Sequence, residues 1–140
     1  MALVYFDAST LVKLVVDEES SDLAAALWDG CDSALSSRLS YPEVRSVLAA
    51  VARDHRINAR SLGKVLRDWE RFWSAIRPVE LTPAVERHAG DLASAYSLRG
   101  ADAIQLASAL AIELPDLIVA VWDHRLREGV RSAGLRVAPA

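Results

Sequence analysis

Short apolar runs alternate along this chain with longer segments in which apolar residues recur every three or four positions. The short runs predict β-strands at residues 3–6, 34–36, 78–81, 117–121 and 135–138. The longer segments predict helices at residues 10–16, 19–30, 40–55, 58–76, 82–100, 101–114 and 123–134. Because strands that alternate with helices need crossover connections, the pattern indicates an α/β fold with a mostly parallel central sheet and helices on both faces.

Local signals predict where several helices begin and end. Ser20 or Ser21 is expected to cap the second helix, because serine is a preferred N-cap residue. Thr82, followed by a proline at the first helical position, is expected to open the fifth helix, and Gly100 is expected to end it.

The bulk composition suits a single domain spanning residues 1–140. Apolar residues make up 52% of the chain, which is enough for a sizeable core. No apolar run approaches the ~20 residues of a membrane span, and the N-terminus lacks the basic segment of a signal peptide. Cys31, the one cysteine, has no partner within the chain and is interpreted as a small core residue in a reducing compartment. These features predict a cytoplasmic protein without a membrane partner.

The helices at 40–55 and 58–76 follow each other without an intervening strand, so we expect this helical pair to protrude from the sheet. The same region carries an unusual charge. Residues 53–77 hold seven bases and three acids, a net charge of +4, whereas the remainder of the chain has a net charge of −7. Four of the bases recur at helical spacing and share one helix face: Arg60, Lys64, Arg67 and Arg71.

Four acidic residues lie where the predicted strands end or the predicted helices begin. Asp7 ends the first strand, and Asp123 follows the apolar run at 117–121. Glu43 and Asp102 each lie in the first turn of a helix. Because sites in open α/β sheets form beyond the carboxyl ends of the strands, we expect these four carboxylates to meet there.

Each of these acids also has a purely structural interpretation. Asp7 and Asp123 are both suited to cap the helices that follow them. Glu43, three residues after Ser40, fits a capping box, and Asp102 complements a helix dipole. Capping does not require acids at all four places, however, so the joint pattern favours a site.

A cluster of carboxylates is electrostatically costly unless a cation lies among them. Oxygen ligands without cysteine or histidine suit Mg²⁺ or Mn²⁺, which activate water and hold phosphoryl oxygens. The acids therefore indicate metal-assisted cleavage of a phosphate ester, and the basic segment indicates a polyanionic substrate.

Four sequence segments resemble the PIN-domain nucleases, and within them the VapC-type toxins of toxin–antitoxin pairs. The segments are VYFDASTLVKL at the start, SYPEV around Glu43, LRGADAIQLASAL around Asp102 and VWDHRLREGVRSAGLRVAP at the end. They occur in the family's order between residues 4 and 139, so the resemblance spans nearly the whole chain. The resemblance implies a PIN-like three-layer α/β/α fold and a metal-dependent endoribonuclease.

The resemblance also implies the roles of individual residues and the partners. Asp7, Asp102 and Asp123 would hold Mg²⁺ or Mn²⁺ directly or through water, and Glu43 would be a ligand or orient the attacking water. Ser9 matches a small hydroxyl residue that supports a carboxylate or a metal-bound water, although helix capping explains it equally well. The implied partners are RNA, a second copy in a homodimer, and a VapB-type antitoxin whose peptide tail covers the site. The implied products carry a 5′-phosphate and a 3′-hydroxyl.

Two residues depart from the family pattern. Gln105 stands where many relatives have histidine, and Trp122 stands where small residues are more usual before the fourth acid. Neither removes a ligand, but Trp122 is expected to narrow the site. A metal-free route would need a histidine acid–base pair, and the three histidines are interpreted instead as surface or packing residues: His55, His88 and His124.

The basic helix face has two interpretations. Arg60, Lys64, Arg67 and Arg71 either contact an RNA backbone or form a solvated face with pairing between residues three or four positions apart. The aromatic residues interleaved with them, Trp69, Phe72 and Trp73, are interpreted as packing in the core or at a dimer contact.

Other functions account for less of the sequence. A haloacid-dehalogenase-type phosphatase needs a second aspartate at position 9, where this chain has Ser9. A response-regulator receiver domain needs adjacent acids after its first strand and a mid-chain phospho-accepting aspartate, and neither is found. Two alternatives stay open: a PIN-like scaffold that binds RNA or protein without cleavage, and a PIN nuclease of RNA processing outside any toxin pair.

Overall fold

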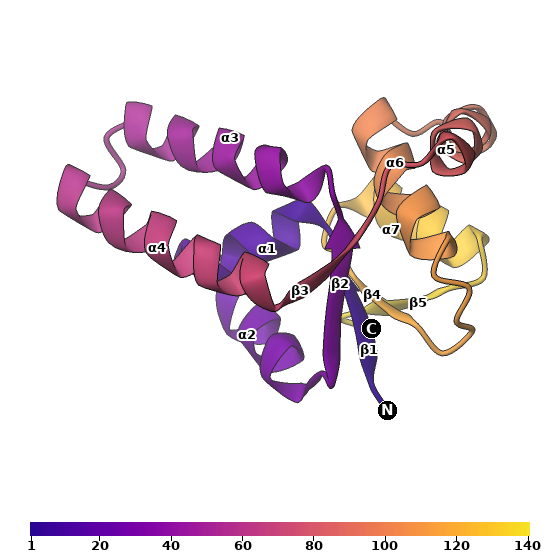
Figure 1. The fold of residues 1–140 in the computed structure, drawn as a ribbon, viewed down its shortest axis with the longest axis horizontal. Helices are drawn as coiled ribbons and strands as arrows, with labels where there is room; N and C mark the ends of the chain where they lie inside the picture. The colour runs from indigo at the N-terminus through magenta and orange to yellow at the C-terminus, as the bar shows by residue number, and fades with distance from the viewer.

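The computed structural model describes all of residues 1–140 and confirms the mixed α/β architecture (Figure 1). The strands are β1 Leu3–Phe6, β2 Ser33–Ser37, β3 Ile76–Val79, β4 Ile118–Ala120 and β5 Arg136–Ala138. The helices are α1 Ala8–Val15, α2 Ser21–Gly30, α3 Ser40–Arg53, α4 Ala59–Ala75, α5 Pro83–Tyr96, α6 Gly100–Leu110 and α7 His124–Ser132.

All five strands form one parallel sheet in the order β3-β2-β1-β4-β5. The first strand of the chain is therefore central, with Tyr5 opposite Leu35 of β2 on one side and Val119 of β4 on the other. Because every pair is parallel, all carboxyl ends share one edge, and the segments that leave β1, β2 and β4 begin side by side.

The sheet separates two apolar cores, one on each face. Successive residues of β1 point to opposite faces, so Tyr5 joins the core under α5, α6 and α7 while Val4 and Phe6 join the core under α1, α3 and α4. Figure 1 shows the corresponding layers, with α1 to α4 on one side of the sheet and α5 to α7 on the other. The three-layer α/β/α arrangement predicted from the sequence is confirmed.

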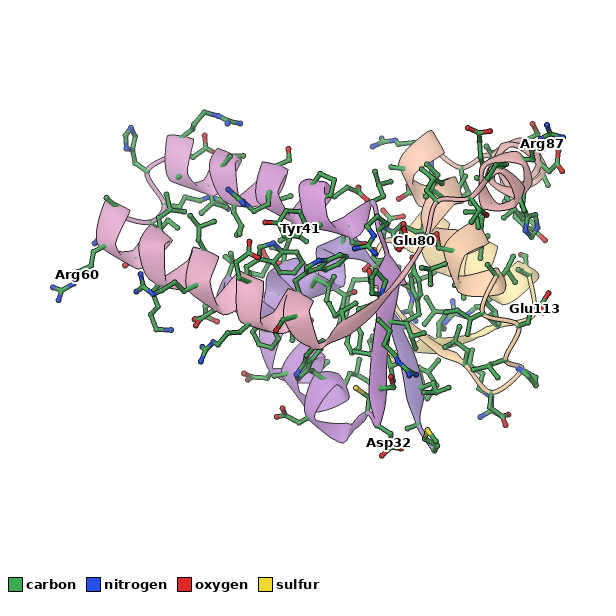
Figure 2. All side chains as sticks on the ribbon, in the orientation of Figure 1. Asp32, Tyr41, Arg60, Glu80, Arg87 and Glu113 are labelled. Carbon is green, nitrogen blue, oxygen red and sulfur yellow. The ribbon has the colours of Figure 1, made fainter.

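Helices α3 and α4 run side by side away from the sheet and form the predicted arm (Figure 1). Its base contains a cluster of Tyr41, Trp69 and Trp73, whose ring centroids lie 5.5 to 5.8 Å apart, and Trp69 is completely buried. The aromatic residues therefore pack, as interpreted. Figure 2 shows Tyr41 between the two helices and Arg60 projecting from the outer end of the arm.

The start of β3 was predicted two residues too late. The strand begins at Ile76, whose buried side chain pairs in register with Ala34, and it continues through Pro78. Proline is tolerated there because β3 is an edge strand, where a missing N–H breaks no ladder. The sequence signal was ambiguous because the last turn of α4 is apolar and runs directly into the strand.

The predicted end of α5 at Gly100 was wrong. The helix ends at Tyr96, Ser97 adopts the left-handed conformation with φ 54°, and the Leu98 N–H donates to the carbonyl of Ala93 at 3.2 Å. This turn places Leu98 in the core at 7% exposure and lets Gly100 begin α6 instead. Burial of Leu98 thus outweighs the preference for glycine at the left-handed position.

The start of α2 only partly matches the expectation for Ser20 or Ser21. Ser20 takes the N-cap position, but its side chain caps nothing. The Ser21 hydroxyl instead accepts from the Glu18 N–H at 3.0 Å and donates to the Val16 carbonyl at 3.1 Å, so it stabilises the preceding turn.

None of the seven helices combines the length and the apolar character needed to cross a membrane.

The left-handed Ser97 predicts a stabilising substitution. We expect Ser97→Gly to raise the free energy of unfolding by about 0.5–1 kcal/mol, because glycine adopts φ near 54° without a Cβ clash. Ser94→Gly within α5 is the matched control and is expected to lower it by about 0.5 kcal/mol. Urea unfolding monitored by circular dichroism measures both, and a destabilised Ser97→Gly would contradict the explanation.

Candidate active site

The four acidic residues selected from the sequence lie at the carboxyl edge of the sheet. Asp7 follows β1 and Asp123 follows the neighbouring β4, while Glu43 and Asp102 lie in the first turns of α3 and α6. Burial is the main cause that raises the pKa of Glu43 and of Asp102; the charges of Asp7 and Asp102 add to the first, and the charge of Asp123 adds to the second. The structure therefore brings the four acids to the same edge of the sheet, and their role as a site stays a prediction.

Asp7 is the most buried of the four, with 4% of its surface exposed. Its Oδ1 accepts from the Thr10 N–H at 2.9 Å and lies 2.6 Å from the Thr10 hydroxyl, and its Oδ2 accepts from the Ser9 hydroxyl at 2.8 Å. Burial raises the pKa of Asp7, these hydrogen bonds oppose the rise, and the charge of Asp102 adds to it. The N-cap interpretation is correct, but the cap uses Oδ1, while Oδ2 accepts only from the Ser9 hydroxyl.

Thr10 was not singled out from the sequence. It is completely buried, and its hydroxyl also lies 2.9 Å from the Ala120 carbonyl at the end of β4. It thereby ties Asp7 to the strand that leads to Asp123. A threonine three residues after an aspartate that ends a strand is the one local signal that points to this contact.

Glu43 does not belong to a capping box, so that structural interpretation was wrong. Leu39 takes the N-cap position, and Ser40 lies inside α3 with its hydroxyl buried 2.7 Å from the Ser36 hydroxyl. Glu43 Oε1 instead accepts from Nε2 of Gln105 at 2.9 Å. Partial burial is the main cause that raises the pKa of Glu43, and the Gln105 hydrogen bond opposes it.

Asp123 caps α7 by accepting from the Leu126 N–H at 2.9 Å, which leaves its second oxygen free. The Asp102 side chain makes no hydrogen bond within the protein, and its pKa is raised by burial and by the charge of Asp123. Two cations oppose this rise, Arg99 and Arg125. Both arginines are exposed, stand at the starts of α6 and α7, and take part in none of the ion pairs of the protein.

The donor chemistry of this cluster fits a hard divalent cation. The oxygens available there belong to carboxylates, without cysteine or histidine, which suits Mg²⁺ or Mn²⁺. As placed, no three acidic, histidine or cysteine side chains converge tightly enough to hold an ion.

Trp122, one of the two residues that depart from the family pattern, lies against α1. Trp122 is half-buried, and the Lys13 ammonium of α1 lies 5.3 Å from its ring centroid, which holds the indole against that helix. The three histidines are all exposed, as interpreted: His55, His88 and His124.

The basic residues of α4 lie on the arm rather than among the acids. Lys64 and Arg71 both pair with Asp68, the lysine at 2.7 Å, while Arg60 and Arg67 form no ion pair. Pairing within the helix, one of the two interpretations, is thus realised for two of the four. Their contact with RNA stays a prediction. Sequence reasoning missed Arg99 and Arg125, because isolated exposed arginines form no pattern.

Comparison with known proteins gives a consistent family assignment. The family description "PIN domain" matches residues 4–128. The ribonucleases VapC45 and VapC49 of Mycobacterium tuberculosis are each 64% identical over 140 residues, which is 100% of this chain and 97% of theirs.

Solved structures share the fold at low sequence identity. Mycobacterium tuberculosis VapC20, described as a sarcin-ricin loop cleaving toxin, superimposes with a TM-score of 0.68 at 16% identity and covers 94% of this chain and 95% of its own. A toxin-antitoxin complex from Klebsiella pneumoniae gives a TM-score of 0.56 at 21% identity, with 84% of each chain covered.

Repulsion among the acids predicts a stability effect of Asp102→Asn. The folded-state pKa of Asp102 is raised, so its ionised form opposes folding, and stability falls as pH rises above the ordinary carboxyl value. We expect Asp102→Asn to stabilise the protein in EDTA by about 0.5 kcal/mol or less near pH 7, because solvent screens this half-exposed carboxylate, with a smaller gain near pH 4. Urea unfolding at both pH values measures this.

Asp91→Asn, which removes an exposed acid of α5, is the matched control for total charge. Mg²⁺ is expected to stabilise the wild type more than it stabilises the Asp102→Asn variant. The cation relieves the repulsion between carboxylates, which the variant has already reduced. Equal destabilisation by Asp102→Asn at both pH values would contradict the electrostatic explanation.

Proposed function

The chain belongs to the PIN-domain family as a VapC-type toxin, and from this premise we propose that it is a metal-dependent endoribonuclease of a type II toxin–antitoxin pair. The observation that carries the proposal is the meeting of Asp7, Glu43, Asp102 and Asp123 at one edge of the sheet. The 64% identity to two ribonucleases over the whole chain supports the same activity.

Each acid has a proposed role that follows from its surroundings. Asp7, Asp102 and Asp123 would hold Mg²⁺ or Mn²⁺, because each has at least one oxygen not used for capping. When bound, the cation lowers the pKa of a coordinated water and neutralises charge on the phosphate. Glu43 is half-buried and belongs to α3, whereas Asp102 belongs to α6 on the other face of the sheet. Glu43 would accept a proton from the attacking water.

The reaction is hydrolysis of an RNA phosphodiester. The water oxygen bonds to phosphorus, the bond from phosphorus to the 3′ oxygen breaks, and that oxygen takes up a proton. The products carry a 5′-phosphate and a 3′-hydroxyl. Ser9 would support this arrangement by donating to Asp7 Oδ2, which orients that oxygen and favours its ionised form.

The proposed partners are RNA, an antitoxin of the VapB type and a second copy of the chain. The antitoxin is proposed because the chain is a VapC-type toxin and a structural neighbour is a toxin-antitoxin complex. A homodimer and a cytoplasmic location are proposed from the family resemblance.

The proposed RNA contacts near the acids are Arg99 and Arg125. They lie close enough to Asp102 to lower its pKa, and no acid of the protein pairs with them. A phosphate next to the scissile bond would offer both guanidinium groups an anionic partner. On α4, Lys64 and Arg71 already share Asp68, so Arg60 and Arg67 are the more available outer contacts.

Cleavage of RNA tests the function directly. The purified, antitoxin-free chain is expected to give discrete 5′-phosphate products from total RNA with Mg²⁺ or Mn²⁺, and none with EDTA. Asp7→Asn is preferred to Asp7→Ala, because asparagine keeps an Oδ1 acceptor for the Thr10 N–H. We expect it to lower the cleavage rate by about 100-fold or more while the protein stays folded.

Asp91→Asn is the control and is expected to cleave within about twofold of the wild type. Binding of RNA without cleavage by the folded wild type in either metal would overturn the proposal in favour of a non-cleaving scaffold. Wild-type activity in Asp7→Asn would instead refute the site assignment.

Salt-dependent binding tests the RNA contacts. In the Asp7→Asn background, Arg99→Gln combined with Arg125→Gln is expected to weaken RNA binding and to reduce the slope of log affinity against log salt by about one per lost phosphate contact. The matched pair Arg60→Gln and Arg67→Gln is expected to have a smaller effect. Fluorescence anisotropy with a labelled RNA measures both, and the reverse ranking would place the main RNA surface on the arm.

A further inference from the structure

A network of buried polar groups, joined by hydrogen bonds, ends at Glu43 of the acidic cluster. Tyr5 and Gln105 are 0% and 3% exposed, and Ser36 and Ser40 are completely buried. These residues come from β1, α6, β2 and α3, so the network connects the two helical layers through the sheet. Apolar side chains of similar size would fill the same space, so this polar network needs an explanation.

Only one assignment of donors and acceptors satisfies all the hydrogen bonds of this network. The Tyr5 hydroxyl donates to Gln105 Oε1 at 2.5 Å. An amide oxygen only accepts, so the buried Tyr5 hydroxyl is the donor of this bond. The amide is thereby oriented with Oε1 toward Tyr5 and Nε2 toward α3. An ionised Glu43 requires the same orientation, because a carboxylate only accepts.

Both protons on Gln105 Nε2 then have an acceptor. One goes to Glu43 Oε1 at 2.9 Å and the other to Ser40 Oγ at 3.0 Å. The Ser36 hydroxyl lies 2.6 Å from the Phe6 carbonyl, which only accepts, so Ser36 donates there and accepts from Ser40 at 2.7 Å. Every member is satisfied, and Glu43 is the only one that reaches solvent.

We propose that Gln105 is the positioning residue for Glu43 and that Tyr5 fixes the amide of Gln105 in the orientation that this requires. The inference rests on the proposed nuclease function, in which Glu43 accepts a proton from the attacking water. Gln105 touches no substrate and acts through Glu43 alone. The amide fixes one carboxylate oxygen and leaves Oε2 for the reaction.

Substitutions at two positions separate positioning from packing. Gln105→Leu removes the donor at similar volume and is expected to lower kcat by about 10- to 100-fold. Tyr5→Phe removes only the orienting hydroxyl and is expected to lower kcat by a smaller factor. Gln105→His restores a ring N–H donor and is expected to recover most of the activity. In all three variants KM for RNA should stay within about twofold of the wild type.

Leu106→Val is the structural control. Leu106 is the next residue of α6, is 1% exposed and packs in the apolar core with no polar atom in its side chain. We expect its kcat to equal that of the wild type. Thermal unfolding of every variant accompanies the kinetics, and Tyr5→Phe decides the question if Gln105→Leu does not fold.

Nuclear magnetic resonance gives a readout that does not depend on cleavage. The side-chain amide protons of Gln105 should be well dispersed and slow to exchange in the wild type and in Leu106→Val. Glu43→Gln should shift one of them, and Tyr5→Phe should accelerate their exchange. Folded Gln105→Leu and Tyr5→Phe proteins with the wild-type kcat would overturn the proposal. A wild type that cleaves no RNA would refute the nuclease function, whereas unshifted amide protons in Glu43→Gln would refute the Gln105–Glu43 contact itself.

Discussion

The burial of one carboxylate at the end of the central strand is the constraint on which the rest of the site depends. Asp7 lies at the middle of a five-stranded parallel sheet and is almost inaccessible to solvent, yet no basic side chain pairs with it. The surrounding groups are instead neutral donors, namely the hydroxyls of Ser9 and Thr10 and the Thr10 N–H in the first turn of α1. Such donors stabilise the charge only in part, which leaves the position suited to a cation that arrives from solvent.

The fold brings its other acids to Asp7 from both layers. Glu43 comes from α3 over one face, and Asp102 comes from α6 over the other. A site assembled in this way needs something to hold the two layers in register across the sheet. The hydrogen bonds from Gln105 to Ser40 and Glu43 cross that boundary, so the geometry of the acids and the packing of the domain are set by the same contacts.

The sequence predicted the strands and the four acids because both are local signals. An apolar run that ends on an acid marks a strand that delivers a carboxylate to the sheet edge. The partners of those acids were not predictable in this way. Tyr5 and Gln105 are 100 positions apart, and Ser40 resembles a capping residue until the buried hydroxyl of Ser36 is placed beside it. Likewise, Ser97 adopts a left-handed conformation because Leu98 must reach the core, which no nearby residue indicates.

The arm has a consequence for how such a protein varies through evolution. Helix α3 leaves the sheet beside the acids and α4 returns to the start of β3, while the turn between them at residues 54–58 is largely exposed. One helical turn added to or removed from both helices at the tip would change the reach of the arm by about 5 Å without moving any strand. Surfaces far from the acids can therefore diverge in length and charge among descendants, while the machinery at the sheet edge is inherited intact.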